Sequence, residues 1–189
     1  MIPTGDRMQI SALNAAQKPR VGVVGFGKTG RAVVSILLQA ADVELRWVVR
    51  QSERLSHRSV AEYLGTDESN DAEILSTREL SADALLTQKP VDIIVDFSGV
   101  DGIGYYGDAA ARRGITILTA ISQYPSEIHL LLHQLALRTR VIHSPNITLG
   151  INFLLIAGKI LKNIAPDTDI EIIEEHFRQK PEISGTAKV

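Results

Sequence analysis

The sequence predicts an α/β protein built on a doubly wound parallel sheet. Two observations lead to this prediction. Short apolar runs alternate with helical stretches along most of the 189 residues, and a glycine-rich turn joins the first run to the first helical stretch. Strands that are apolar along their whole length are typical of parallel sheets, because helices cover both faces of such sheets.

Four strands are expected in this part of the chain. They are the apolar, mostly β-branched runs at residues 21–24, 43–49, 91–97 and 115–119. A run of four to eight such residues between turn-forming residues is typical of a buried strand.

Helices are expected between these strands, where apolar residues recur every three or four positions. The candidates are residues 29–41, 77–88, 102–113 and 125–137. In the first of them the pattern is Ala32, Val33, Ile36, Leu37 and Ala40. Each helix therefore has one apolar face with which it can cover the sheet.

The composition excludes several classes of partner. The net charge of −2 gives no electrostatic reason to expect nucleic acid or an anionic membrane as a partner. There is no cysteine to form a disulfide. Residues 1–20 lack the apolar run of a signal peptide, and no later run is long enough to cross a bilayer, so we expect a cytoplasmic protein. His129 and His133 are four residues apart but have no third ligand nearby, so no metal site is expected.

The glycine-rich turn has the spacing of a dinucleotide-binding loop. It consists of Gly25, Phe26, Gly27, Lys28, Thr29 and Gly30, which is the pattern GxGxxG between a strand and a helix. In such a Rossmann loop the first glycine allows the tight turn, the second lets the backbone approach a pyrophosphate, and the third lets helix and strand pack closely. N–H groups at the helix N-terminus then hold the phosphates. A turn with no ligand is the alternative.

The end of the second strand indicates which dinucleotide would bind. NAD-selective domains place an acidic residue about 20 positions after the loop, where it binds the ribose 2′-hydroxyl. Here the strand ends at Val49 and Arg50, with Arg54 close behind. A guanidinium pairs with a 2′-phosphate, which a carboxylate would repel. We therefore expect NADPH as the preferred cofactor, with NADH as the alternative.

Asp96 lies near the end of the third predicted strand. In open parallel sheets, ligands bind in the crevice at the carboxyl ends of the strands. Asp96 is therefore expected either to support a ligand site or to have a structural role.

The C-terminal stretch carries groups suited to catalysis. After an apolar helix expected at residues 150–164 and a strand expected at 169–177, His176 can exchange a proton near neutral pH. Lys180 can supply an ammonium group, and residues 184–186 (Ser-Gly-Thr) form a hydroxyl-bearing turn that suits a carboxylate. A charged tail without a role is the alternative.

The order of these motifs resembles that of the dihydrodipicolinate reductase family. Residues 174–187 resemble its signature Glu-x-His-His-x-x-Lys-x-Asp-x-Pro-Ser-Gly-Thr-Ala. Residues 95–98 resemble its Ile-Asp-Phe-Thr strand end, and residues 144–152 resemble its Ala-Pro-Asn-Phe-Ser-Val-Gly-Val-Asn segment. The resemblance covers residues 20–189.

The resemblance implies hydride transfer from NAD(P)H to a cyclic imine dicarboxylate, 4-hydroxy-tetrahydrodipicolinate, in lysine and diaminopimelate biosynthesis. It implies that His176 is the catalytic histidine and that Lys180 is the general acid. The implied substrate-binding residues are Phe177, Ser184, Gly185 and Thr186. The implied nicotinamide pocket consists of Phe97, Ser98, Thr119, Ala120, Ser144, Asn146 and Ile147. Full-length members are homo-oligomers.

Several differences from the family pattern leave alternatives open. Phe177 stands where many members have a second histidine, and the interval from Lys180 to Ser184 is one residue shorter than usual. Residues 119–122 read Thr-Ala-Ile-Ser in place of Gly-Thr-Thr-Gly. The alternatives are a related reductase for another amino-acid-derived substrate, and a non-catalytic NADP(H)-binding module.

The domain organisation follows from these motifs. Residues 1–19 are expected to be a flexible leader, and residues 20–146 a dinucleotide-binding domain. Residues 147–189 are expected to begin an incomplete α+β substrate domain. Since family members continue well past the Ser-Gly-Thr turn, we expect a C-terminally truncated reductase.

Overall fold

A computed structural model of the chain describes residues 18–66, 70–171 and 173. Seven strands in these ranges form one sheet, in the order β3-β4-β2-β1-β5-β6-β7. The strands are β1 (Arg20–Val24), β2 (Glu44–Arg50), β3 (Arg58–Ser59), β4 (Glu73–Ser76), β5 (Ile93–Asp96), β6 (Thr116–Thr119) and β7 (Val141–His143). All neighbours pair in parallel except β3 and β4, which are antiparallel.

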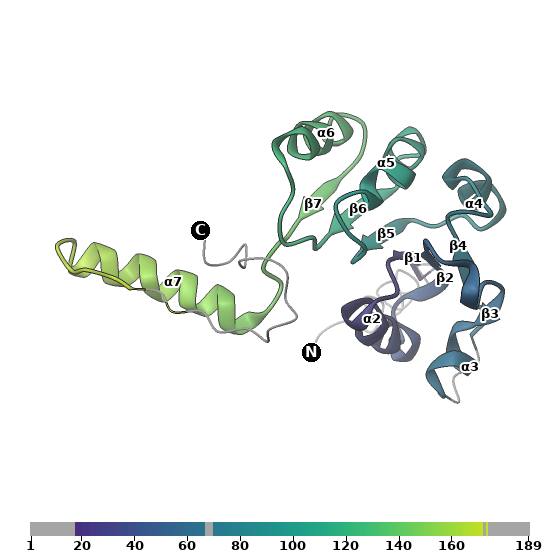
Figure 1. The fold of residues 1–189 in the computed structure, drawn as a ribbon, viewed down its shortest axis with the longest axis horizontal. Helices are drawn as coiled ribbons and strands as arrows, with labels where there is room; N and C mark the ends of the chain where they lie inside the picture. The colour runs from purple at the N-terminus through teal and green to yellow at the C-terminus, as the bar shows by residue number, and fades with distance from the viewer. Residues whose placement is uncertain (1–17, 67–69, 172, 174–189) are drawn as a thin grey trace, which may run out of the picture.

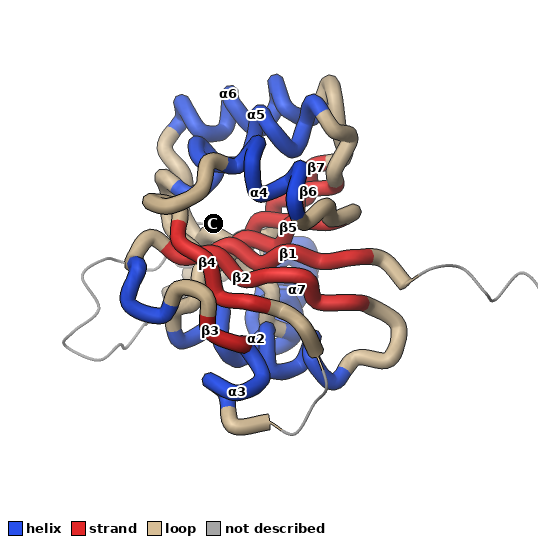
Figure 2. Tube along the Cα trace, turned by 90° about the vertical axis from the view of Figure 1, so that its right-hand side faces the viewer, coloured by secondary structure: helices blue, strands red, loops and turns tan. Residues whose placement is uncertain are grey.

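Helices cover both faces of the sheet, as Figures 1 and 2 show. On one face lie α2 (Lys28–Gln39) and α3 (Val60–Leu64). On the other lie α4 (Ala82–Gln88), α5 (Gly102–Arg112) and α6 (Ser126–Ala136). A short 3-10 helix, η1 (Glu53–Leu55), precedes β3. The expected doubly wound α/β architecture is confirmed.

Two clusters of buried apolar side chains join the sheet to its two helical layers. One contains Val34 of α2 with Val48 and Ile74 of the sheet, all fully buried. The other contains Trp47 of β2, whose indole Nε1 donates to the carbonyl oxygen of Lys89 at 3.0 Å. The inner strands thus bury both of their faces, which explains why β1, β2, β5 and β6 read as continuous apolar runs.

Three short elements at the β3 end of the sheet were not predicted: β3, β4 and α3. The helix expected from residue 77 begins only at Ala82, because residues 77–80 form a turn. Ser81 caps the helix there, since its Oγ accepts from the backbone N–H of Ala84 at 3.2 Å. The last strand, β7, was also missed, because only three residues of it are in the sheet.

Helix α7 (Leu149–Ile164) extends away from the sheet in Figure 1 and matches the helix expected at residues 150–164. None of its residues is buried. The strand expected at residues 169–177 is not present at 169–171 or 173, where the backbone is irregular, and its other residues lie outside the described ranges. No helix in the described part of the chain is both long and apolar enough to span a membrane.

Candidate functional site

The glycine-rich turn connects β1 to α2 and is held by backbone contacts. Gly25 has a φ of 97°, which favours glycine, and its N–H donates to the carbonyl oxygen of Val49 at 2.8 Å. A Cβ added at Gly25 would overlap the backbone of Ser98, and one added at Gly30 would overlap the carbonyl oxygen of Gly25. A Cβ at Gly27 would meet open space. Packing therefore requires the first and third glycines, while Gly27 leaves room for a ligand to approach the backbone.

The first turn of α2 leaves its backbone N–H groups available to an anion. Gly27 is the N-cap and makes no side-chain capping bond, and no acidic residue lies in the first turn. Lys28 and Thr29 are exposed there. Unsatisfied N–H groups and the positive end of the helix dipole favour a bound phosphate. These features fit the pyrophosphate of a dinucleotide.

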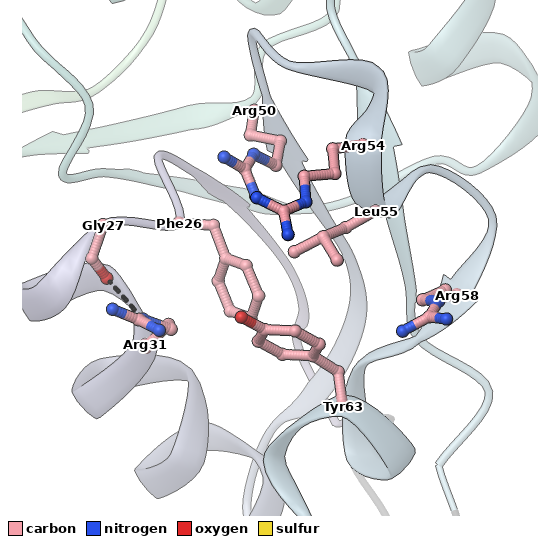
Figure 3. Close-up of a pocket in the computed structure, with 8 residues that line it drawn as sticks. All are labelled: Phe26, Gly27, Arg31, Arg50, Arg54, Leu55, Arg58 and Tyr63. Atoms are coloured by element: carbon pink, nitrogen blue, oxygen red, sulfur yellow. Dashed lines mark hydrogen bonds between the residues drawn. The ribbon is translucent and has the colours of Figure 1, made fainter.

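Two adjoining hollows lie beside this turn. The larger, of about 810 Å³, runs from the turn to the segment after β5 and is lined in part by Phe97 and Ser98. The smaller, of about 660 Å³, is drawn in Figure 3. Phe26, Gly27 and Arg50 line both hollows, so the two share a wall.

Four arginines line the smaller hollow, one each from α2, the end of β2, η1 and β3: Arg31, Arg50, Arg54 and Arg58. In Figure 3, Gly27 and Arg31 lie on one side of it and Arg58 on the other. Arg31 Nε donates to the carbonyl oxygen of Gly27 at 3.4 Å. None of these four guanidiniums pairs with a carboxylate among the described residues.

Most of the other arginines in the described chain behave differently. Five of these seven form ion pairs with aspartate or glutamate, namely Arg20, Arg46, Arg112, Arg113 and Arg138, whereas Arg78 and Arg140 do not. None of the described residues that line the smaller hollow is acidic. The hollow therefore concentrates positive charge that is free to bind an anion, and guanidiniums bind phosphate bidentately.

An aromatic pair forms another wall of the smaller hollow. The rings of Phe26 and Tyr63 have centroids 5.5 Å apart and planes tilted by 51°. Tyr63 comes from α3, and Leu55 of η1 lies beside the pair in Figure 3. The hollow thus offers apolar surface as well as charge, which suits a phosphorylated nucleoside.

The expected nicotinamide residues lie at the carboxyl edge of β5, β6 and β7. The register pairs Asp96 with Thr119 and Thr119 with His143. Ala120 follows β6, and its N–H donates to the carbonyl oxygen of Asp96 at 3.0 Å. Ser144 follows β7, and its N–H donates to the carbonyl oxygen of Thr119 at 2.9 Å. The topology therefore brings these expected residues to the same edge as Phe97 and Ser98.

Of the seven residues expected in the nicotinamide pocket, only Phe97 and Ser98 line a hollow; the other five, Thr119, Ala120, Ser144, Asn146 and Ile147, line neither. Thr119 is fully buried, and its hydroxyl bonds to Tyr124 Oη at 2.7 Å. Asn146 and Ile147 lie on the segment that leads to α7, where Asn152 Nδ2 donates to the carbonyl oxygen of Asn146 at 2.7 Å. Their contact with a cofactor stays a prediction.

Asp96 is a buried acid next in sequence to Phe97 and Ser98, which line the larger hollow. Its side chain is fully enclosed, and burial raises its pKa, while hydrogen bonds from Ser98 and Tyr106 act in the opposite direction. The carboxylate lies at the end of β5, directly before Phe97, and whether it supports a ligand site or has a structural role stays a prediction.

The expected catalytic and substrate-binding residues lie outside the described residues. They are His176, Phe177, Lys180, Ser184, Gly185 and Thr186. Their roles remain predictions.

Sequence reasoning missed Arg31, Arg58 and Tyr63. Arg31 could have been found, because it follows Gly27 by four residues and so lies on the helix turn above the loop. Arg58 and Tyr63 belong to β3 and α3, which are too short to give a periodic signal.

Comparisons with known proteins agree with this geometry. A family model described as "Dihydrodipicolinate reductase, N-terminus" matches residues 19–147. The 4-hydroxy-tetrahydrodipicolinate reductase of Burkholderia multivorans is 28% identical over 174 residues, which is 89% of this chain and 62% of that protein. That of Methanothermobacter thermautotrophicus is 28% identical over 176 residues, again 89% and 62%.

A solved structure gives the same result for the fold. Dipicolinate-bound dihydrodipicolinate reductase from Paenisporosarcina sp. TG-14 superposes with a TM-score of 0.62 at 16% identity, over 80% of this chain and 56% of that one. The chain spans about three fifths of the curated relatives it matches. Because the family model covers more than half of the sequence, the chain belongs to the dihydrodipicolinate reductase family, whose N-terminal part it matches.

Proposed function

We propose that this chain supplies the cofactor-binding part of an NADPH-dependent reductase of 4-hydroxy-tetrahydrodipicolinate. Members of the family bind NAD(P)H. The observation that carries the proposal is the hollow lined by unpaired arginines beside the glycine turn. Such a hollow is chemically matched to the 2′-phosphate that distinguishes NADPH from NADH.

The described residues divide the binding task between two ends of the site. Gly27 and the first turn of α2 would hold the pyrophosphate. Arg50, Arg54 and Arg58 would hold the 2′-phosphate, and the ring of Tyr63 would border the adenosine. The larger hollow, at Phe97, would take the nicotinamide end.

A bound reduced nicotinamide would supply the hydride, and the chain would supply orientation and protons. Phe97 and the enclosed strand ends would hold the ring in one orientation and exclude water. Lys180 would protonate the substrate carbon after hydride addition, with His176 beside it. The Ser-Gly-Thr turn at residues 184–186 would bind a substrate carboxylate through hydroxyl and N–H donors. The matched relatives carry the name of this substrate's reductase.

Calorimetric titration tests the cofactor preference. Wild type should bind NADPH more tightly than NADH. The double substitution Arg50→Ala/Arg54→Ala should weaken NADPH binding by about tenfold or more and leave NADH binding nearly unchanged, since each hydrogen bond to a charged group contributes ~1.5–3 kcal/mol. Arg46→Ala is the matched control, because Arg46 lies on the same strand but pairs with Glu44. An equal loss for both dinucleotides would contradict a 2′-phosphate site.

Turnover tests the reaction. NADPH oxidation should be followed with freshly generated 4-hydroxy-tetrahydrodipicolinate. Lys180→Ala should abolish turnover and leave NADPH binding intact, because the proposed role of Lys180 is proton donation. Unchanged turnover in this variant would exclude Lys180 as the general acid.

The second candidate is an NADP(H)-binding module without catalysis. It is favoured by the match of the family model, which covers residues 19–147 and therefore the described dinucleotide site. NADPH binding with no turnover under the same conditions would support this candidate.

A further inference from the structure

Asp96 is a buried carboxylate that no step above uses. It ends β5, which lies between β1 and β6 in the sheet. The strands that follow β1 extend the sheet toward one edge, and those that follow β5 extend it toward the other. The strand order therefore reverses between β1 and β5, and Asp96 lies at this point. Its side chain is 0% exposed, and no cation pairs with it in the described part of the chain.

Three donors occupy the two oxygens of this carboxylate. Oδ1 accepts from the backbone N–H of Ser98 at 2.8 Å and from Ser98 Oγ at 2.6 Å. Oδ2 accepts from Tyr106 Oη at 2.9 Å. Ser98 is the second residue of the loop between β5 and α5, and Tyr106 lies inside α5. The carboxylate therefore links the start of this loop to the helix that follows it.

The same loop forms a wall of the larger hollow, which residues 97–102 line without interruption. Its packing leaves little freedom, because a Cβ added at Gly102 would overlap Ser98 Oγ and would lie 3.1 Å from Asp96 Oδ2. Both donors of Ser98 are already bonded to Asp96. Ser98 thus contributes to the hollow mainly by holding the loop in shape.

From this geometry we infer that Asp96 is a positioning residue of the dinucleotide site: its carboxylate, through Ser98 and Tyr106, fixes the loop of residues 97–101 against the larger hollow. The inference rests on the proposed function, since it requires that a dinucleotide binds there. Asp96 itself has no exposed surface with which to touch a ligand.

This arrangement makes dinucleotide affinity depend on pH. Burial raises the pKa of Asp96 above its ordinary value. The titratable groups facing it are Tyr106 on α5 and Tyr124 after β6. Burial raises the pKa of Tyr124 to about 12 and that of Tyr106 well above its ordinary value, so both are neutral in acid. His143 lies behind Tyr124, with ring centroids 5.1 Å apart. Protonation of Asp96 removes the negative charge of the acceptor, so its hydrogen bonds with Ser98 and Tyr106 become neutral and weaker, and the loop loosens.

The test is the dissociation constant of NADP⁺, measured by calorimetry on the full chain from neutral pH downward. Asp96→Asn should raise it about tenfold at neutral pH, as expected for a lost charged hydrogen bond, and should flatten the acid part of the pH profile. Ser98→Ala should raise the dissociation constant by less. The double variant Asp96→Asn/Ser98→Ala should bind NADP⁺ no more weakly than Asp96→Asn alone, because the two residues act as one unit. Asp92→Asn is the matched control: it changes a carboxyl at the opposite end of β5, whose partner is Arg20.

The outcomes separate this inference from the proposed function. Wild type that fails to bind NADP⁺ overturns both. Wild type that binds, with Asp96→Asn and Ser98→Ala binding equally well, overturns the positioning role alone. If thermal unfolding shows that Asp96→Asn does not fold, the NADP⁺ dissociation constant of Ser98→Ala and its pH profile test the positioning role instead. Titration of NAD⁺ in parallel removes the 2′-phosphate as a titrating group, so a pH profile seen with NADP⁺ alone overturns the pH dependence assigned to Asp96.

Discussion

The sheet and helix α7 differ sharply in how they treat their apolar residues. In the sheet, Val23, Val48 and Ile94 are 0% exposed, whereas in α7 Phe153 is 67% and Ile164 is 77% exposed. Both segments are apolar in sequence, and both form regular backbone structure. The sheet contains its own core, because helices cover both of its faces. The comparison teaches that an apolar helix can be recognised from its sequence, whereas what it packs against cannot.

Five of the exposed apolar residues of α7 are arranged along one face, while Leu154 and Leu161 are exposed elsewhere on the helix. Leu149, Phe153, Ile156, Ile160 and Ile164 follow one another at intervals of three and four residues. Such a stripe is typical of a helix that packs against a further layer. The change in burial falls close to residue 146, where the sequence predicts the boundary between the two domains; that boundary stays a prediction.

Removing a large apolar side chain from each region should give the largest contrast. Trp47→Ala should lower the free energy of unfolding by ~3–5 kcal/mol, because it opens a cavity beside the sheet and removes the bond to Lys89. Phe153→Ala on α7 should change it by less than ~0.5 kcal/mol, as surface substitutions do. Urea unfolding of both variants measures the difference. Similar losses would mean that α7 is covered in solution.

The same glycine-to-alanine change should alter the stability of the protein in opposite directions in the sheet region and in α7. Gly30→Ala should destabilise the protein by ~1–3 kcal/mol, because the new Cβ would overlap the backbone of Gly25. Gly158→Ala in α7 should stabilise it by ~0.5–1 kcal/mol, since a Cβ there meets open space and alanine favours a helix.

Thermal unfolding of these two variants gives the signs directly, and Gly27→Ala serves as the control within the glycine turn. Gly27 has ordinary backbone angles and open space around it, so this change should preserve stability and weaken NADPH binding. A stable Gly30→Ala variant would contradict the close approach of helix and strand.

The residues that sequence could predict share a physical property. β1, β2, β5 and β6 are buried on both faces, so a local run of β-branched residues identifies them. β4 has only Ile74 and Leu75 between a glutamate and a serine, and it becomes a strand through its pairing with β2. Tertiary pairing of this kind leaves no local signal.

The residues of the candidate site also divide into those with a local sequence signal and those that depend on tertiary pairing. Arg50 was predictable, because the fold fixes the distance from the glycine loop to the end of the second strand. Arg58 depends on β3, whose place at the sheet edge is set by antiparallel pairing with β4. The network of Asp96 was only partly predictable: position indicated a ligand-side residue, but the bonds to Ser98 and Tyr106 require the loop geometry.

The smallest difference that we expect between the sheet and α7 is an electrostatic contribution to the free energy of unfolding. In the sheet, the hydrogen bonds and charge of Arg20 hold the pKa of Asp92 below its ordinary value. A carboxyl with a lowered folded-state pKa stabilises the fold above its unfolded-state pKa, and this stabilisation disappears as pH falls through the folded-state value. Asp92→Asn should therefore cost less than ~1 kcal/mol at neutral pH, since the pair is partly exposed, and the cost should vanish in acid.

Lys159→Gln on α7 is the control for this last effect. Neither Lys159 nor Lys162 forms an ion pair with a carboxylate in the described ranges, and Lys162 Nζ instead donates to the carbonyl oxygen of Pro166 at 2.6 Å. Chemical denaturation of wild type and both variants at neutral and acid pH should show a pH-dependent difference for Asp92→Asn alone. A comparable pH dependence for Lys159→Gln would mean that α7 meets acidic groups in solution, and that the exposed helix is in contact with another surface.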